Sequence, residues 1–271
     1  MQQHKRISFI GAGNMSKAII GGLVSKEYPA DKITASNRSI EKLDLLKSTF
    51  NINITLNNQE AVDNADILVL AVKPQLMQEV CQNLQINDNT IVVSIAAGLP
   101  ISRLQVFLNG NKKIVRVMPN TPSAIGMGMS GIYATAEVSK NELAEVDNVM
   151  QSVGKTIIVE NESDINTVIA AAGSSPAYFF LIAESMQKCA MDMGLTKQQA
   201  RALVEQAMLG SAKLMQHESS LELSELRHQV TSKGGTTAKA IESLQNDNIE
   251  KIFANAMQAA ITRAEEMSSQ F

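Results

Sequence analysis

The residues best suited to hold a small anion lie in one segment near the C-terminus, Val230–Thr237 (VTSKGGTT). This segment contains two adjacent glycines and four hydroxyl side chains, and it directly precedes a helical pattern over Ala238–Leu244. Glycine lets the backbone turn tightly and approach a ligand closely. The first turn of a helix has unpaired N–H groups and a positive dipole end, which favour a carboxylate. Taken alone, the segment is better explained as an ordinary loop and helix cap, and the second glycine-rich turn changes that interpretation.

A second glycine-rich turn, Gly11–Ser16 (GAGNMS), lies near the N-terminus. It comes between the apolar run Ile7–Ile10 and a helical pattern, which is the context that a dinucleotide-binding turn requires. Gly11 would make the tight turn, and Gly13 would let the backbone approach a pyrophosphate. Ser16 stands where a third glycine is usual, and it is small enough for close packing of helix on strand. The alternative is an ordinary strand-to-helix turn.

The end of the second predicted strand indicates which nicotinamide cofactor is used. An acidic residue there binds the ribose 2′-hydroxyl of NAD, whereas an arginine accommodates the 2′-phosphate of NADP. This chain has Asn37, Arg38 and Ser39 and no acidic residue before Glu41. Because the guanidinium is a planar fork of donors that suits phosphate, we predict NADPH as the preferred cofactor and NADH as a second candidate. The alternative is an exposed arginine without a ligand.

Three later strand ends carry small residues and prolines, and ligands bind at the carboxyl ends of strands in open α/β sheets. The first end has Lys73 and Pro74, the second has Ala97, and the third has Met118-Pro119-Asn120. Together they suggest a walled slot for a flat ring. The alternative is that these small residues and prolines only form the turns after the strands. No nucleophile–base pair or metal-ligand spacing accompanies them, and the three histidines are isolated. Hydride transfer fits this pattern, because the cofactor supplies the difficult chemistry.

Composition excludes several classes of function. With a net charge of −3, a pI of about 5.7 and no dense basic run, nucleic acid is not expected as a partner. The two cysteines, Cys81 and Cys189, lie in helical apolar patterns and are predicted to be buried. The N-terminus lacks the apolar core of a signal peptide. The longest apolar region, Val168–Ala183, is interrupted by Gly-Ser-Ser-Pro, so we expect a buried helical hairpin or kinked helix and not a membrane span. A cytoplasmic location fits these features.

The elements that must position these residues form a predicted doubly wound α/β domain, in which helical patterns such as Ile40–Thr49 and Gln75–Leu84 separate apolar strands. The six predicted parallel strands are Arg6–Ile10, Ile33–Ser36, Ile52–Thr55, Ile67–Val72, Thr90–Ile95 and Lys113–Met118. Two further runs, Gly131–Ala134 and Thr156–Val159, extend the sheet around a helix at Lys140–Val153.

From Glu162 onward the pattern is helical throughout, which predicts a dinucleotide-binding domain over residues 1–161 and a helical domain over residues 162–271. The predicted helices are Glu162–Ala172, Pro176–Met193, Lys197–Lys213, Glu222–Val230, Thr237–Gln245 and Asn248–Met267. Helices that are apolar on several faces need partners, so we expect a homodimer, with a decamer as the candidate larger assembly.

Five segments occur in an order that resembles the pyrroline-5-carboxylate reductase family over essentially the whole chain. They are Ile10–Met15, Ala71–Gln75, Val117–Pro122, Gly173–Tyr178 and Val230–Thr237. The resemblance implies NAD(P)H-dependent reduction of 1-pyrroline-5-carboxylate to L-proline, the last step of proline biosynthesis. It also implies an N-terminal Rossmann-type domain, a C-terminal helical dimerisation domain, and an active site between the cofactor domain of one subunit and the helices of its partner.

The resemblance assigns roles by position. Ser232, Gly234, Gly235, Thr236 and Thr237 would hold the substrate carboxylate and ring nitrogen, with Ser232 and Thr237 as the catalytic candidates. Asn58 would contact the cofactor ribose, and Ala71, Lys73 and Ala97 would line the nicotinamide pocket. The complete predicted cofactor site is Gly11, Gly13, Asn14, Met15, Asn37, Arg38, Ser39, Asn58, Ala71, Lys73, Pro74, Ala97 and Asn120. No metal is expected.

Two departures from the family pattern leave other hypotheses open. Ser175 replaces a usual glycine, and Lys233 replaces a usual proline, which should loosen the turn and add positive charge beside an anionic substrate. One alternative is a β-hydroxyacid dehydrogenase-like reductase, whose catalytic lysine would have to be Lys188. The other is a non-catalytic NADP-binding paralogue.

Overall fold

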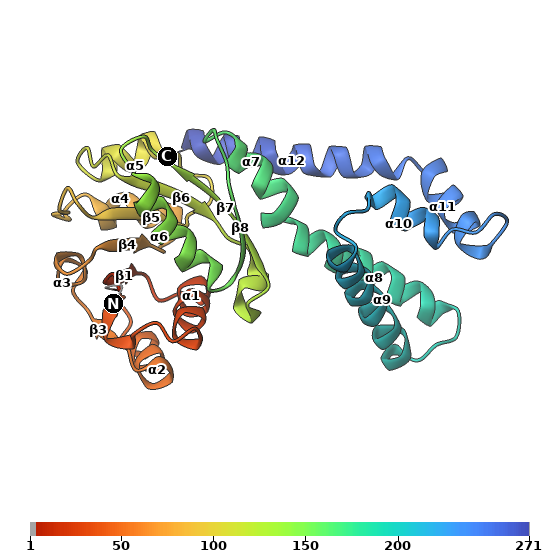
Figure 1. Cartoon of the computed structure of the whole chain (residues 1–271), viewed down its shortest axis with the longest axis horizontal. Helices are drawn as coiled ribbons and strands as arrows, with labels where there is room; N and C mark the ends of the chain where they lie inside the picture. The colour runs from red at the N-terminus through yellow and green to blue at the C-terminus, as the bar shows by residue number, and fades with distance from the viewer. Residues whose placement is uncertain (1–3, 271) are drawn as a thin grey trace. The chain divides into compact units, whose positions relative to one another are not determined.

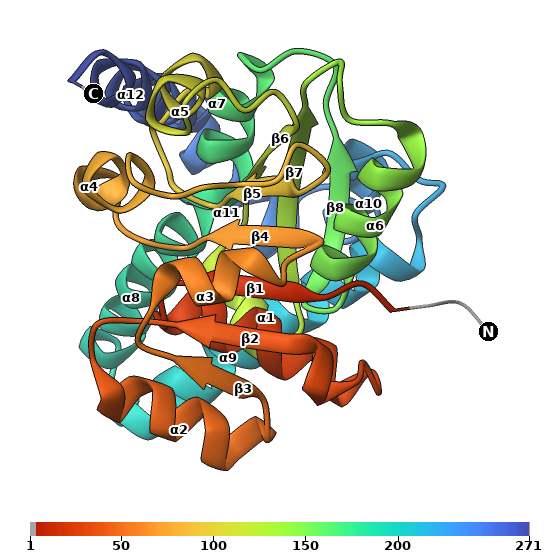
Figure 2. The ribbon, with the colours of Figure 1, turned by 90° about the vertical axis from the view of Figure 1, so that its left-hand side faces the viewer.

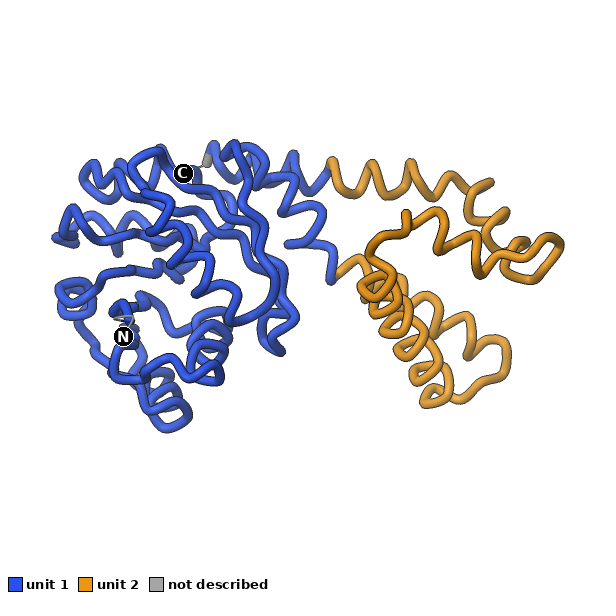
Figure 3. Tube along the Cα trace, in the orientation of Figure 1, with its two compact units in different colours: residues 1–176, 259–271 blue, residues 177–258 orange. Residues whose placement is uncertain are grey.

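The computed structural model describes residues 4–270, and these form two compact units (Figure 3). Unit 1 extends to Pro176 and includes the C-terminal segment from Ala259, whereas unit 2 is Ala177–Gln258. The first helix after residue 161 belongs to unit 1, because Ile165 and Ile169 are buried against the sheet side chains Met118, Tyr133 and Val159. The division at residue 161 remains a prediction about functional domains, distinct from this division into compact units.

Unit 1 is built on an eight-stranded sheet in the order β3-β2-β1-β4-β5-β6-β7-β8 (Figures 1 and 2). All neighbouring strands are parallel except β6 and β7. The strands are β1 (Ile7–Ile10), β2 (Ile33–Ser36), β3 (Asn53–Thr55), β4 (Ile67–Leu70), β5 (Ile91–Ser94), β6 (Ile114–Met118), β7 (Gly128–Ala134) and β8 (Gly154–Ile158). The predicted doubly wound sheet is confirmed.

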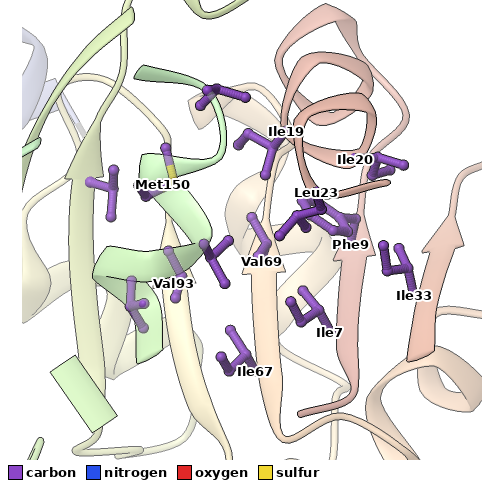
Figure 4. Close-up of a cluster of buried hydrophobic side chains, with 14 of the residues drawn as sticks. Ile7, Phe9, Ile19, Ile20, Leu23, Ile33, Ile67, Val69, Val93 and Met150 are labelled. Carbon is purple, nitrogen blue, oxygen red and sulfur yellow. The ribbon is translucent and has the colours of Figure 1, made fainter. Parts of the chain in front are cut away.

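Successive residues of a strand point to opposite faces of the sheet, and here both faces carry apolar side chains. Helices therefore cover both faces. On one face α1 (Asn14–Ser25), α2 (Ile40–Phe50) and α6 (Lys140–Gln151) pack on a cluster that includes Phe9 and Val69 (Figure 4). The helices of the other face are α3 (Asn58–Asp63), α4 (Met77–Cys81) and α5 (Ile101–Phe107). Burial raises the pKa of the Cys81 thiol to about 12, as expected of a packing cysteine.

A helical stretch with one wide turn joins the two units. It consists of α7 (Asp164–Val168), the π-helical turn η4 (Ile169–Gly173) and α8 (Ser175–Asp192). The interruption corresponds to the predicted kinked helix and not to a hairpin; the amide of Ser174 donates to the carbonyl of Ile169, 2.8 Å away. The prediction that this region is buried is wrong for its second half in the single chain, because no residue of α8 is buried. By length and composition alone, Asp164–Asp192 could cross a membrane, with a mean hydropathy of 1.4 over its apolar window.

Unit 2 consists of helices with very little core of their own. Beyond α8 these are α9 (Lys197–His217), α10 (Leu223–Gln229), α11 (Thr236–Asn246) and α12 (Ile249–Gln270), which runs on into unit 1. Within unit 2, Ala200 and Val204 are the only buried residues. The prediction that Cys189 is buried is wrong for the single chain, because this core-poor unit leaves it exposed.

Candidate active site

The first glycine turn is fixed between two strand ends. The amide of Gly11 donates to the carbonyl of Ser36 at 2.8 Å, and the amide of Ala71 donates to the carbonyl of Ile10 at the same distance. Gly11 has φ = +108°, and a Cβ placed there would lie 2.6 Å from the carbonyl oxygen of Ala71. Glycine is therefore required here both by conformation and by the close approach of the backbone at Ala71.

The start of α1 has the features of an anion site. Gly13 occupies the N-cap, no side chain caps the helix, and a Cβ at Gly13 would meet nothing within 4 Å. The N–H groups of the first turn, including those of Asn14 and Met15, have no side-chain cap, and the open space at Gly13 lets a pyrophosphate approach them. Ser16 is fully buried, and its hydroxyl donates to the carbonyl of Gly11 at 2.6 Å, which explains how serine replaces the third glycine.

The end of β2 is tied to the neighbouring loops by short polar side chains. The buried Ser36 hydroxyl donates to Oδ1 of Asn58 at 2.5 Å, which orients that amide at the start of α3. Asn37 receives a long hydrogen bond of 3.5 Å from the amide of Ala12. The Ser39 hydroxyl donates to Glu41 at 2.6 Å and holds the pKa of that carboxyl below its usual range. Nδ2 of Asn37 also donates to the carbonyl of Ser39 at 3.2 Å, so Asn37 connects the glycine turn to the loop after β2.

Arg38 lies in a pocket of about 450 Å³, whose lining also includes Asn57, Asn58, Val80 and Asn83. Its guanidinium Nη1 is 3.3 Å from Oε1 of Glu79, a residue of α4 that also lines the pocket. The two side chains are 68% and 63% exposed, so both are accessible to a ligand. Sequence reasoning found Arg38 but missed Glu79.

The residues of the predicted ring slot differ in their exposure and in whether their side chains are free to contact a ligand. Ala71, Pro74 and Ala97 are half-buried, and Lys73 is exposed. Asn120 is buried, but its amide is occupied: Nδ2 donates to the carbonyl of Ala172 at 3.0 Å, and Oδ1 accepts from the amide of Met129 at 2.9 Å. The side chain of Asn120 thus braces the loop after β6, and a cofactor contact through this residue would have to come from its backbone.

A partly buried ion pair that sequence reasoning missed connects β6 to the start of α5. Arg116 on β6 is 4% exposed, and its Nη1 donates to Oε1 of Glu162 at 3.0 Å. The same carboxylate oxygen accepts from the amide of Ile101 at 2.8 Å, at the start of α5 and close to Ala97 in sequence. Burial lowers the pKa of Arg116, and Glu162 opposes that shift. An arginine inside an apolar strand was the available signal for such a pair.

The second glycine-rich turn lies in unit 2, where it starts α11. Gly235 is the N-cap without a capping side chain, and its amide donates to the carbonyl of Ser232 at 3.0 Å. Gly234 has φ = +73°, a conformation that disfavours the other residue types. Ser232, Thr236 and Thr237 are exposed, and no hydrogen bond engages their side chains within residues 4–270. The predicted anion-ready helix start is therefore present.

The remaining chemistry-bearing residues form no second centre. His217 pairs with Glu218 on the surface, 2.9 Å apart, and His4 stacks edge-on against Tyr28. Across residues 4–270 no group of three or more His, Cys, Asp or Glu side chains could hold a metal ion. The site residues thus separate into cofactor candidates in unit 1 and substrate candidates in unit 2.

Residues 162–267 match the family described as pyrroline-5-carboxylate reductase dimerisation, and residues 6–98 match NADP oxidoreductase, coenzyme F420-dependent. A curated pyrroline-5-carboxylate reductase from Vibrio alginolyticus is 50% identical, over 99% of this chain and 100% of that protein.

Two solved structures extend the likeness to the whole fold. A reductase of this name from Coxiella burnetii is 39% identical, with a TM-score of 0.92 over 98% of this chain and 99% of that one. The Plasmodium falciparum pyrroline carboxylate reductase, described with NADP bound, is 26% identical, with a TM-score of 0.86 over 99% and 100% of the two chains. The chain belongs to the pyrroline-5-carboxylate reductase family.

Proposed function

We propose that this chain reduces 1-pyrroline-5-carboxylate to L-proline with hydride from a reduced nicotinamide dinucleotide, at the residues described above. The proposal rests mainly on one observation: two helices of this chain each follow a glycine-rich turn and begin without a capping side chain. One follows Gly11 and suits a pyrophosphate, and the other follows Gly234-Gly235 and suits a carboxylate. Family membership supports the same reaction.

The chemistry needs positioning more than it needs acid–base groups. Hydride from the cofactor adds to C5 of the cyclic imine, the ring nitrogen retains or gains a proton, and the products are proline and the oxidised cofactor. We assign the substrate carboxylate to the N–H groups at the start of α11, with the Ser232 hydroxyl beside it, and the ring nitrogen to the Thr237 hydroxyl. The imine is basic enough to take its proton from solvent, which agrees with the lack of a histidine at either turn.

Turnover of the imine by the purified chain, measured separately with NADPH and NADH, tests the proposal. We expect proline formation with both cofactors and a higher kcat/KM with NADPH. Binding of NADPH without turnover of the imine would favour the non-catalytic paralogue. Oxidation of a β-hydroxyacid with NADP⁺, in place of imine reduction, would favour the dehydrogenase hypothesis, which family membership argues against.

Arg38→Ala should weaken binding of NADPH and leave binding of NADH nearly unchanged, because only NADPH carries the 2′-phosphate. A charge-assisted contact contributes about 1–3 kcal/mol. Because Arg38 is largely exposed and already paired with Glu79, we expect the lower end, a loss of roughly five- to tenfold in affinity. Titration of each cofactor by fluorescence measures this, and equal losses for both would show that Arg38 does not contact the phosphate.

We infer the assembly and location with the same reasoning. A homodimer is supported by the match of residues 162–267 to a dimerisation family, and further assembly into a decamer remains a proposal. The apolar stretch Asp164–Asp192 would then be covered by protein and not by lipid.

A cytoplasmic location is supported by two unpaired cysteines, Cys81 and Cys189, since a reducing compartment preserves free thiols.

A further inference from the structure

The carboxylate of Glu79 is the nearest charged partner of Arg38. Its Oε1 is 3.3 Å from Nη1 of Arg38, and both residues line the pocket of about 450 Å³ that also contains Asn58. Arg38 follows β2, Asn58 begins α3 beyond β3, and Glu79 is on α4 beyond β4. The ion pair therefore connects segments that follow two different strands at the ligand-binding edge of the sheet.

This pocket is placed to take the adenosine half of a dinucleotide. The pyrophosphate site is at the turn after β1; β2 lies next to β1 in the sheet, and β3 lies next to β2. A residue at the end of β2 lies beside the ribose of a bound dinucleotide in this fold, so Arg38 would meet the 2′ position. Glu79 brings a negative charge to the same guanidinium.

We propose that the Glu79 carboxylate competes with the cofactor 2′-phosphate for Arg38, and thereby limits how strongly the chain prefers NADPH over NADH. Glu79 is thus a specificity-determining residue that acts through Arg38. The proposal rests on the nicotinamide cofactor of the proposed function and adds a determinant that the arginine alone does not supply.

The charges decide the direction of the effect. A phosphate monoester carries about −1.5 to −2 charges at neutral pH, and it must displace or share a guanidinium that a carboxylate already occupies. Exposed ion pairs contribute little to folding, so Arg38 can exchange partners at small cost. NADH has only a hydroxyl at this position, so its binding leaves the ion pair intact. Glu79 therefore opposes NADPH selectively.

Glu79→Gln tests this by removing the charge while keeping the shape of the side chain. In direct titrations without substrate, we expect the Kd for NADPH to fall by about three- to tenfold and the Kd for NADH to change by less than about twofold. The gain should shrink at high salt, because exposed charges are screened over about 8–10 Å. Glu137→Gln is the matched control, since it removes one exposed carboxylate of unit 1 outside this pocket.

A double variant shows whether Glu79 acts through the arginine. In an Arg38→Ala background, Glu79→Gln should no longer improve NADPH binding by more than about twofold. The proposal is overturned if Glu79→Gln changes both cofactors equally, changes neither, or retains its full gain without Arg38. Because binding needs no turnover, a selective gain in a chain that fails to reduce the imine would sustain this proposal and remove only the proposed function. Absence of NADPH binding in the wild-type chain would overturn both.

Discussion

Replacement of Thr237 by alanine should lower kcat/KM for the imine by about ten- to a hundredfold and leave the Kd for NADPH within about twofold. Thr237 is the second residue of α11, and its exposed hydroxyl has no hydrogen-bond partner within residues 4–270. It is therefore available to the ring nitrogen of the substrate. Loss of one hydrogen bond at a reacting centre costs about 1–3 kcal/mol, and small errors in positioning reduce hydride transfer further.

Two controls separate catalysis from folding in this experiment. Thr237→Ser keeps the hydroxyl, so we expect its kcat/KM to stay within a few fold of the wild type. Since the Thr237 side chain is exposed, the thermal unfolding midpoint of Thr237→Ala should be unchanged. Steady-state kinetics with varied imine at saturating NADPH gives the answer. If Thr237→Ala retained full kcat/KM, the hydroxyl would have no part in the reaction, and the backbone N–H groups alone would hold the substrate.

The strands could be predicted from the sequence because a parallel sheet buried on both faces requires continuous apolar runs. The strand Ile33–Ser36 was predicted to the residue, and the others differ at their ends. The helices α3 and α5, of six and seven residues, were missed. For α3, the available signal was Asn57, whose side chain accepts a 2.9 Å hydrogen bond from the amide of Gln59 as an N-cap.

Site residues fixed by local backbone geometry were easier to predict than residues fixed by distant partners. Gly11 has the positive φ and the close backbone contact that a turn of this type requires, and Gly234 has the positive φ of its own turn. The pairing of Arg38 with Glu79 spans 41 positions, and that of Arg116 with Glu162 spans 46. Such long-range pairs are determined by strand order, which the sequence does not specify residue by residue.

The apolar pattern of the helices in unit 2 predicted a homodimer, and a single chain cannot test that prediction. Helices that are apolar on several faces predicted a partner, and the single chain leaves large apolar side chains of unit 2 exposed. Among them are Phe179, Phe180, Leu181, Leu203, Leu209 and Leu223. Exposed apolar patches of this extent mark interaction sites. A second copy of the chain is the partner that the dimerisation family supports.

Leu203→Glu should therefore convert the dimer to a monomer and reduce imine turnover by more than about a hundredfold. Leu203 is 60% exposed on α9, and a carboxylate at an apolar interface would be buried without a partner, which costs several kcal/mol. Obligate homodimer interfaces bury more than about 2,000 Å², so the two subunits stabilise each other's helices. Sedimentation velocity across a range of protein concentrations, together with the turnover assay, measures both effects.

Gln198→Glu is the matched control, because it adds the same charge to an exposed polar position of α9 five residues before Leu203, on the other side of the helix. We expect this variant to remain dimeric and active, which would show that the position of the charge and not the net charge decides assembly. A wild-type chain that sediments as a fully active monomer would refute the dimer, since the exposed apolar side chains would then need no second copy. Recovery of the wild-type chain only with lipid or detergent would instead favour a membrane contact at Asp164–Asp192. The dimer accounts for both apolar regions with one partner, which is why we favour it.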